Sequence, residues 1–479
     1  MTRINQNISS LQAIHKLTAN QNYMSIRLER LSSGLKINRG KDDPSGLIAS
    51  ENLRAEMKSI NSAVENSVRA NNVISTAEGA LNEVSALLLE IRGLVTLSAN
   101  SGAMADEERQ ANQLQVDSIL ESIDRIANTT QFNGKKLLDG SLEYNLSAVP
   151  TSAIQEVRVY AAKVPENGTM PVVIQVKNSA EFARLKFSAA GIASSATVAI
   201  RVEGNVGSEV FGFAGSTTIS AIAATINGFR DTLGVSATIS GTGALYFNST
   251  TYGSDSFVKV ESINPGSDFL TRTMTGTNST SSTHYGEDAD VYINGQQTTV
   301  KGLRATLRNN SLDMEILLTT ARGTTQGSST FGVTGGGATF QLSPTVNTTG
   351  QVSLGIYSVS TGTLGNNDVG RLSSIRSGGA NSLVAGEEIN AQRIVDRAIT
   401  QISVMRGRLG AFQKNTLETN INSQQVALEN VTASESAIRD ADFAQETAAM
   451  TRAQILVQAT TTILKTANSS PQNVLSLLS

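Results

Sequence analysis

The chain contains no cysteine and has only two histidines among its 479 residues. Without cysteine it has no disulfide, no thiolate zinc site and no thiol nucleophile. Its 38 basic and 41 acidic residues leave a net charge of -3, which gives no electrostatic footprint for nucleic acid or for an anionic membrane. We therefore expect neither a nucleic-acid partner nor insertion into a membrane.

Long apolar runs are also missing. Residues 1–20 alternate polar and apolar side chains, so they lack the continuous apolar region of a cleaved signal peptide. No other stretch reaches the roughly 20 apolar residues that a membrane-spanning helix requires. If the protein leaves the cell, we expect a route that does not read such a signal.

Glycine is scarce at both ends of the chain and abundant in the middle. Residues 1–130 and 380–479 hold 9 glycines in 230 positions, whereas residues 131–379 hold 31 in 249 and five of the seven prolines. Since both residue types break helices, this partition predicts helical ends around a β-rich centre. We expect a multidomain α+β protein whose N- and C-terminal helices pair in an antiparallel coiled coil or bundle, with a β-rich central insertion.

The N-terminal region is predicted to form three helices. The first has a narrow apolar stripe and stops at Ser32-Ser33-Gly34. The second starts at Asp43-Pro44, with Asp43 as N-cap, and the third covers about 105–129 and ends before the turn at Asn133-Gly134. An unbroken 4-3 alternation, typical of a coiled coil, marks the second half of the second helix: Ala77, Leu81, Val84, Leu88, Ile91 and Val95.

The C-terminal region mirrors this pattern. One long helix is predicted, whose apolar stripe continues past Gly410 in a displaced phase from Leu417 to Ile438. The last helix has apolar residues spaced by sevens from Phe443 and is expected to end at Pro471. The long helix begins with another strict 4-3 series: Ala391, Val395, Ala398, Ile402, Met405, Leu409 and Phe412.

A two-helix pair with such narrow stripes buries little apolar surface. Each ordered residue costs about 1–2 kcal/mol of backbone entropy, so the outermost helices are expected to be marginal in isolation. Stacking with identical neighbours would bury more of each apolar face and couple ordering to assembly. From the pattern alone, an intramolecular bundle without a polymeric role is equally consistent with the stripes.

The middle, about 141–379, is predicted to form one or two β-rich domains that project outward from any rod the helices build. Val157–Tyr160 and Val172–Val176 are short β-rich runs. The glycine-rich segment Gly332–Gly337 lacks the Gly-Lys-Ser/Thr ending of a phosphate loop, so it is expected to bend or bulge a strand.

Candidate catalytic and metal-binding groups are few. His15 and His284 lie far apart in the sequence and outside any His-Glu-x-x-His pattern, which indicates ordinary surface or packing histidines. Asp288 and Asp290 resemble the opening of a calcium loop, but Tyr292 occupies the next ligand position and no glutamate closes the frame. We therefore predict that the protein is not an enzyme and has no cofactor and no metal site.

Several collinear motifs resemble those of bacterial flagellins. They cover about 1–145 and 375–479, with weaker similarity in the centre to the repeat motif of flagellin and hook-protein inserts. The N-terminal motifs are Arg30–Asn38, Lys41–Asp43, Gly46-Leu47, Thr76–Leu81, Ile123–Ala127 and Gln131–Gly134. The C-terminal motifs are Asn420–Asn422, Ser436–Ala444 and Pro471–Leu478, and the central ones are Thr217–Asn227, Gly234–Ala237 and Tyr252–Val258.

The resemblance implies a structural subunit that self-assembles into the extracellular bacterial flagellar filament for swimming motility. It implies export through the flagellar type III secretion system, an export chaperone at the C-terminal tail, and contact with filament cap and hook-junction proteins. It also implies three domains: a terminal inner-core domain at 1–40 and 437–479, a helical rod domain with a β-hairpin at 41–150 and 376–436, and a surface-exposed outer region at 151–375.

Three sets of residues are expected to carry these functions. The polymer-core interface is expected at Ile4, Ile8, Leu11, Leu28, Leu31, Phe443, Met450, Leu456, Ile463, Leu475 and Leu478. Packing of the rod-domain helices is expected at Leu81, Val84, Leu88, Ile91, Ile402, Leu409 and Phe412. Residues 88–99 are similar to the segment through which many flagellins engage an innate immune receptor; Arg92 and Leu94 match, but Glu90 replaces a basic contact residue, so we predict weak or absent activation.

Two alternative functions remain open at this point. A hook-filament junction protein shares these termini but agrees less well in the blocks around Ser33-Gly34 and Pro471–Leu478, and it makes a short adaptor ring. A secreted adhesin would bind a surface ligand through the central insert. Long seeded polymers favour flagellin, a nonpolymerising subunit favours the adaptor, and binding retained by the isolated insert favours the adhesin.

Overall fold

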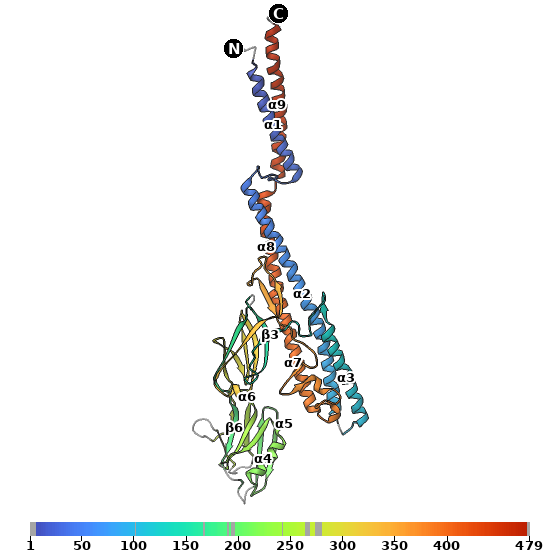
Figure 1. Cartoon of the computed structure of the whole chain (residues 1–479), viewed down its shortest axis with the longest axis vertical. Helices are drawn as coiled ribbons and strands as arrows, with labels where there is room; N and C mark the ends of the chain where they lie inside the picture. Colours follow the sequence, from blue (N-terminus) through green and yellow to red (C-terminus); the bar gives the residue numbers. More distant parts are fainter. Residues whose placement is uncertain are drawn as a thin grey trace. The chain divides into compact units, whose positions relative to one another are not determined.

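The chain forms two compact units. One comprises Met1–Asn71, Gln341–Gly350 and Phe412–Ser479, and the other comprises Asn72–Phe340 and Gln351–Ala411. Figure 1 shows the computed structural model. It describes residues 6–100, 102–165, 168–188, 191–192, 197–241, 243–263, 269–273 and 280–476, with side chains up to residue 469.

In the first unit, helix α1 (Ile8–Ser33) lies beside helix α9 (Phe443–Ser476) (Figure 1). The two run antiparallel, because the start of α1 contacts the end of α9 and the end of α1 contacts its start. Helix α1 ends at Gly34 in the left-handed conformation, with φ 72°, which confirms the predicted stop. The Asp442 carboxylate starts α9 by accepting the N–H groups of Ala444 and Gln445.

Helix α9 continues through Pro471 to Ser476, so the predicted end at Pro471 is wrong. Proline lacks the N–H that would bond to the carbonyl four residues earlier, which belongs to Ala467. That carbonyl accepts the side-chain amide of Asn7 at 2.8 Å instead. A replacement donor therefore accompanies the proline within the helix.

Helix α2 (Pro44–Ser98) begins where the sequence predicts, because the Asp43 carboxylate accepts the N–H of Gly46 at 3.0 Å. A two-stranded bridge precedes it. There the N–H of Lys36 donates to the Arg439 carbonyl at 2.6 Å, and the N–H of Ala441 donates to the Gly34 carbonyl at 2.9 Å. The chain segments that follow α1 and precede α9 are thus joined through their backbones.

Helical conformation runs without a break from α7 (Glu388–Phe412) through a π-helical turn (Gln413–Glu418) to α8 (Thr419–Arg439). A π turn accommodates one residue more than an α turn, so it rotates the apolar stripe that follows it. The predicted long helix with a displaced phase after Gly410 is confirmed, and the π turn is its cause.

In the second unit, α2, α3 (Asp106–Thr129) and α7 share one apolar core. Ion pairs mark their adjacency, with Arg92 Nε 3.1 Å from Asp396 Oδ1 and Arg109 Nε 3.8 Å from Glu388 Oε1. The buried Gln113 side chain joins α3 to the segment before α7 by donating to the Ile375 carbonyl and accepting the N–H of Leu383. The short helices η1 (Leu372–Ile375) and η2 (Leu383–Ala385) lie in that segment.

The β-rich centre contains two apolar cores between antiparallel sheets. In the first, sheet β15-β14-β5-β19-β3 packs on sheet β16-β17-β18-β4. A register shift between Val333 and Gly335 confirms the predicted bulge. The strands are β3 (Tyr144–Ser147), β4 (Ile154–Ala162), β5 (Met170–Asn178), β14 (Asp290–Ile293), β15 (Gln296–Gln297), β16 (Thr299–Lys301), β17 (Arg304–Arg308), β18 (Leu312–Leu318) and β19 (Gly327–Gly336).

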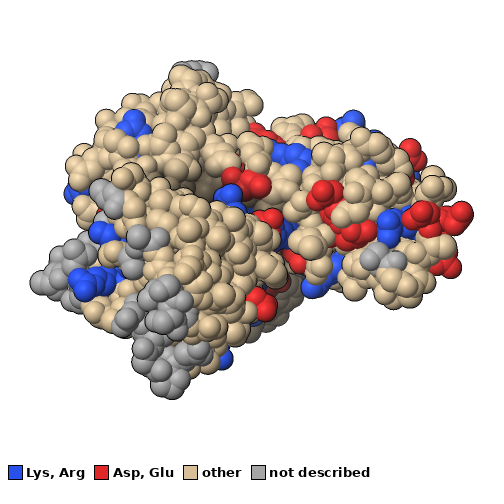
Figure 2. All heavy atoms as spheres, turned by 90° about the horizontal axis from the view of Figure 1, so that it is seen from below, with Lys and Arg blue, Asp and Glu red and all other residues tan. Residues whose placement is uncertain are grey.

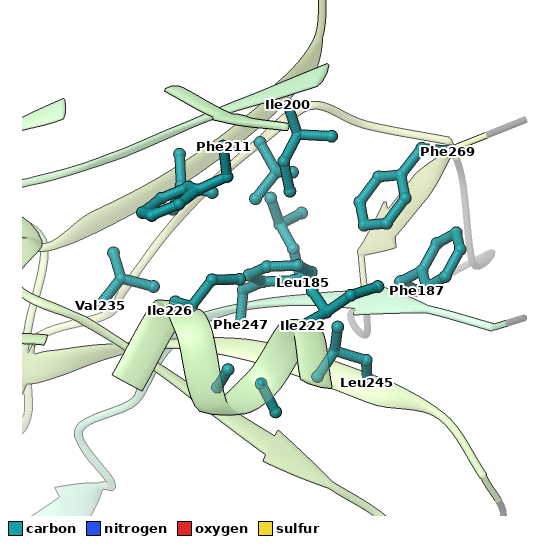
Figure 3. Packing of buried hydrophobic residues seen from close by; sticks show 14 of the residues in the cluster. Leu185, Phe187, Ile200, Phe211, Ile222, Ile226, Val235, Leu245, Phe247 and Phe269 are labelled. Atoms are coloured by element: carbon teal, nitrogen blue, oxygen red, sulfur yellow. The ribbon is translucent and has the colours of Figure 1, made fainter. Parts of the chain in front are cut away.

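The second core belongs to residues inserted between β5 and β14. Sheets β12-β6-β10-β9 and β13-β11-β7-β8 enclose it with helix α4 (Ile219–Gly228), whose Ile222 and Ile226 point toward Phe247 (Figure 3). Its strands are β6 (Phe182–Phe187), β7 (Val198–Gly204), β8 (Ser208–Phe213), β9 (Val235–Ile239), β10 (Leu245–Tyr252), β11 (Phe257–Ser262), β12 (Thr271–Thr273) and β13 (Thr283–Tyr285).

Short elements complete the description. Asn133 and Gly134, with φ 49° and 80°, form the predicted turn of a hairpin. Figure 2 shows that charged side chains are sparse over the β-rich region on the face presented and denser over the helices. The remaining elements are β1 (Gln131–Phe132), β2 (Lys135–Lys136), α5 (Arg230–Leu233), α6 (Thr320–Gly323), β20 (Ala338–Gln341), β21 (Gln351–Leu354), β22 (Gly365–Asn366) and β23 (Gly370–Arg371).

Candidate self-assembly surface

The interior of the α1–α9 pair is made of small and polar side chains. Ala13 is 5% exposed, Ala453 0%, Thr460 7% and Glu446 6%. No large apolar side chain among the described residues of the two helices is buried to this degree. The pair therefore removes little apolar surface from water on its own.

Glu446 is held by two arginines of α1. Arg27 Nη1 lies 2.8 and 2.7 Å from its two carboxylate oxygens, and Arg30 Nη1 lies 3.1 Å from one of them. Burial raises the pKa of Glu446, but the hydrogen bonds and charges of Arg27 and Arg30 outweigh it, so the net pKa lies below the ordinary value. The group is thus a charged, nearly enclosed link between the helices.

Large apolar side chains of both helices face solvent. Those of α1 are Ile8, Leu11, Ile14 and Leu28, which are 46–55% exposed, and those of α9 are Phe443, Ile455, Leu456 and Ile463, which are 43–63% exposed. We call these eight residues the exposed stripe. Exposed large apolar side chains are candidates for contact with another protein chain.

The exposed stripe contains six of the eleven residues expected at the polymer core. Leu31 and Met450 are half-buried, while Ile4, Leu478 and the Leu475 side chain lie outside the described residues. Ile455 was missed by the sequence analysis because it lies beside the seven-residue repeat. Its position next to Leu456, as an apolar neighbour outside the repeat, was the available signal.

Six of the seven residues expected to pack the rod-domain helices lie inside the bundle of the second unit, and Phe412 belongs to the first unit. Leu81, Val84, Leu88, Ile91 and Ile402 are 0% exposed and Leu409 is 1% exposed. Phe412, the last residue before the π turn, is half-buried. Here three helices of one chain bury the apolar residues at heptad spacing, whereas α1 and α9 leave large apolar residues exposed.

The segment similar to an immune-receptor contact lies on α2. Glu90 and Arg92 are exposed, and the Arg92 side chain pairs with Asp396, whereas Leu94 is only 8% exposed. The surface that this segment presents therefore combines an acidic residue, an arginine already engaged within the chain, and a leucine that faces the bundle.

The other candidate groups have structural partners. His284 Nδ1 accepts the N–H of Arg184, and Asp288 accepts the N–H groups of Ser254 and Gly302. In the part of the chain that the structure describes, no three His, Asp or Glu residues gather as metal ligands. Over the same residues, no helix is long and apolar enough to cross a membrane.

A pair of terminal helices that buries small and polar side chains and exposes large apolar ones is typical of a structural subunit that associates with other copies of itself. Comparison with known proteins gives the family. The model of the bacterial flagellin N-terminal helical region matches residues 4–143, that of the C-terminal helical region matches 392–478, and the flagellin hook IN motif matches 199–251.

Curated relatives agree over the full length. The chain is 31% identical to B-type flagellin of Pseudomonas aeruginosa and 30% identical to flagellin D of Vibrio anguillarum, in each case over 99% of both chains. Flagellar hook associated protein-3 from Legionella pneumophila resembles it at 13% identity over 81% of this chain and 98% of that one, with a TM-score of 0.32, too low to carry an argument.

The chain belongs to the bacterial flagellin family. It is a structural subunit of the extracellular flagellar filament, which serves motility. The family resemblance, the α+β fold class and the filament function predicted from the sequence are confirmed, and the junction-protein and adhesin alternatives are not favoured. The IN motif covers two of the three central blocks, Thr217–Asn227 and Gly234–Ala237.

Proposed function

We propose that the exposed stripe of α1 and α9 is the contact by which subunits pack in the filament interior. The observation that carries the proposal is the exposure of eight large apolar side chains on a helix pair that buries only small ones itself. Burying one such side chain is worth about 1.5–3 kcal/mol. Several of them provide a strong drive toward association with identical chains.

The layers of the subunit follow from this proposal. Residues 1–40 and 437–479 form the inner core, residues 41–150 and 376–436 form the rod with its β-hairpin, and residues 151–375 form the outer region. The division is supported by the closed apolar cores of the bundle and of the two sandwiches, which need no second copy to exclude water. The terminal helices bury no large apolar side chain among the described residues. Helix α8 of the rod also contains no buried residue.

Elongation from short filament seeds, followed by electron microscopy, tests the proposal. The intact chain is expected to form long filaments, and a chain without residues 1–40 and 437–479 none. Leu11→Ser and Ile463→Ser should each slow elongation strongly. Val206→Ser removes a side chain of similar exposure, 57%, from the turn between β7 and β8 and is the matched control. Equal elongation by all three point variants would contradict the proposal.

We further propose that the chain is exported by the flagellar type III system and that a dedicated chaperone holds its C-terminal tail before export. Assembly then takes place beneath a cap protein, on a base of hook-junction proteins. Family membership and the apolar C-terminal sequence Val474 to Leu478 support this sequence of events. Capture of the chaperone by a peptide of residues 437–479, and its loss when the tail leucines become serine, is the expected result.

We also propose that activation of the innate immune receptor is weak. Support comes from the exposed Glu90, from the engagement of Arg92 with Asp396, and from the burial of Leu94. An acidic residue in place of a basic one repels a matching partner. In a cell reporter assay the chain should activate far less than an enteric flagellin, and Glu90→Arg should raise its activity. Activation equal to the enteric protein would contradict this.

A further inference from the structure

We propose that three polar contacts, rather than apolar packing, set the register in which α1 and α9 pair. The contacts join Asn7 to Ala467, Asn20 to Thr460, and the two arginines Arg27 and Arg30 to Glu446. We call them the polar ladder. They lie near the two ends and between them, so together they fix which residues of α1 stand opposite which residues of α9.

Apolar packing leaves the register weakly determined. The buried positions Ala453 and Thr460 of α9 are small and seven residues apart, and Ala467 continues the spacing. Sliding α9 by one heptad, about 10.5 Å, would therefore bring another small side chain to each of these contacts. The half-buried Met450, Val457 and Leu464 recur with the same spacing, so the slide would change little of the apolar burial within the pair.

The Glu446 contact does distinguish registers. Both carboxylate oxygens are bonded to Arg27 and one also to Arg30, and the carboxylate side chain is 8% exposed. A slide by one heptad would separate these charges and leave a nearly enclosed carboxylate unpaired, which is strongly unfavourable. Single polar residues in coiled-coil seams select a register in the same way.

The Asn7 contact is specific for a different reason. Carbonyls in the body of a helix are already bonded to N–H groups, but Pro471 leaves the Ala467 carbonyl without that donor. Pro471 is the only proline in α9, so a free acceptor occurs at one place in the body of the helix. Asn7 reaches it at 2.8 Å while its Oδ1 accepts the N–H of Ser10 and caps α1.

The middle contact completes the ladder. Asn20 Nδ2 donates to Thr460 Oγ1 at 2.9 Å, and Thr460 is 7% exposed. With the register fixed, the exposed apolar side chains of α1 have defined positions along α9. This consequence rests on the proposed function, whereas the register itself can be measured without polymer growth.

The absence of cysteine makes a crosslinking test direct. Asn20→Cys with Thr460→Cys reports the observed register, and Asn20→Cys with Ala467→Cys reports a slide of one heptad. Intrachain disulfide formation in the full-length protein, in solution and in seed-grown filaments, should be at least about tenfold faster for the first pair. Glu446→Arg should abolish this preference. Adding Arg27→Glu, which restores two arginines and one glutamate, should bring it back.

The control is Glu29→Arg, which reverses a charge in the exposed pair with Arg39 and should leave the preference unchanged. Equal crosslinking of the two cysteine pairs with the Asn7 and Glu446 contacts intact would overturn the inference, as would a preference that survives Glu446→Arg. Failure of the cysteine-free chain to elongate from seeds is a separate result. It would overturn the proposed function and leave the register measurement standing.

Discussion

Apolar residues have the same heptad spacing in the bundle of α2, α3 and α7 as in the pair of α1 and α9. The two regions differ in how far these residues are buried within the chain. In the bundle, Leu81, Leu88 and Ile402 are 0% exposed. In the pair, the repeat positions Met450, Val457 and Leu464 are only half-buried, and Leu11 and Ile463 are 55% and 58% exposed. Each helix of the bundle packs against two other helices, whereas each helix of the pair packs against one. Heptad spacing therefore predicts that a helix packs against other helices. It does not predict whether those helices belong to the same chain or to another copy.

The largest expected effect is on the free energy of unfolding of the monomer, which should depend on the bundle and not on the exposed stripe. Leu88→Ala opens a cavity in the bundle and should lower the free energy of unfolding of the monomer by about 2–5 kcal/mol. Leu11→Ala, at an exposed position, should change it by less than about 0.5 kcal/mol and act on filament elongation instead. Denaturant unfolding of the monomer measures the first quantity and seeded growth the second. A monomer equally destabilised by both variants would contradict the comparison.

The next effect concerns the polar interior of the pair. Glu446→Ala leaves Arg27 and Arg30 without their partner and should weaken helix pairing by about 1–3 kcal/mol. Because each 1.4 kcal/mol is about a factor of ten, the concentration of free subunit in equilibrium with filaments should rise by about fivefold to a hundredfold. Sedimentation of filaments measures it. A Glu429→Ala variant, on the exposed face of α8, is the matched control and should change little.

A smaller, pH-dependent effect has the same origin. Since the folded-state pKa of Glu446 is lowered, the unfolded state takes up the proton more readily. The stabilisation is therefore complete above the ordinary glutamate pKa and is lost as the pH falls through the folded value. The groups that face Glu446 are Arg27 and Arg30, and Tyr23 bonds to Arg27.

The pH dependence is measured as the free-subunit concentration at decreasing pH. It should rise in the acidic range for the unaltered chain and rise less for Glu446→Gln, which cannot titrate. Equal slopes for the two proteins would assign the acid sensitivity to other carboxylates.

The smallest expected effect tests the link between Asn7 and the proline. Asn7→Asp keeps an acceptor for the N–H of Ser10 but removes the donor to the Ala467 carbonyl, so it should weaken pairing by about 0.5–1.5 kcal/mol. In a Pro471→Ala background the helix supplies its own donor, and the same change should cost less. A cost that is identical in the two backgrounds would show that the contact is not coupled to the proline.

Local signals in the sequence predicted much of the helical structure. Gly34 ends α1, and Asp43 caps the start of α2. The shift in the apolar stripe between Phe412 and Leu417 indicates the π turn. These features depend on residues within a few positions of each other, which a sequence displays directly. The stripes of the bundle and of the pair were visible for the same reason.

The contacts that join the two ends of the chain were not predicted. Arg27 and Glu446 lie 419 positions apart, and neither occupies an apolar position of the repeat. Where α9 continues through Pro471, the Ala467 carbonyl accepts a hydrogen bond from Asn7, which is 460 positions away. Periodicity carries no information on such pairs, so the polar interior of the pair was visible only in the structure.

Hydrogen exchange tests the central claim most directly, because protection of backbone amides shows whether a helix is packed in the free subunit or only in the filament. Amide exchange of α1 and α9 would be compared with that of α2, α3 and α7, in the free subunit and in seed-grown filaments. We predict that the bundle is equally protected in both states and that α1 and α9 become strongly protected only in the filament. Terminal helices that are as protected in the free subunit as in the filament would contradict the account.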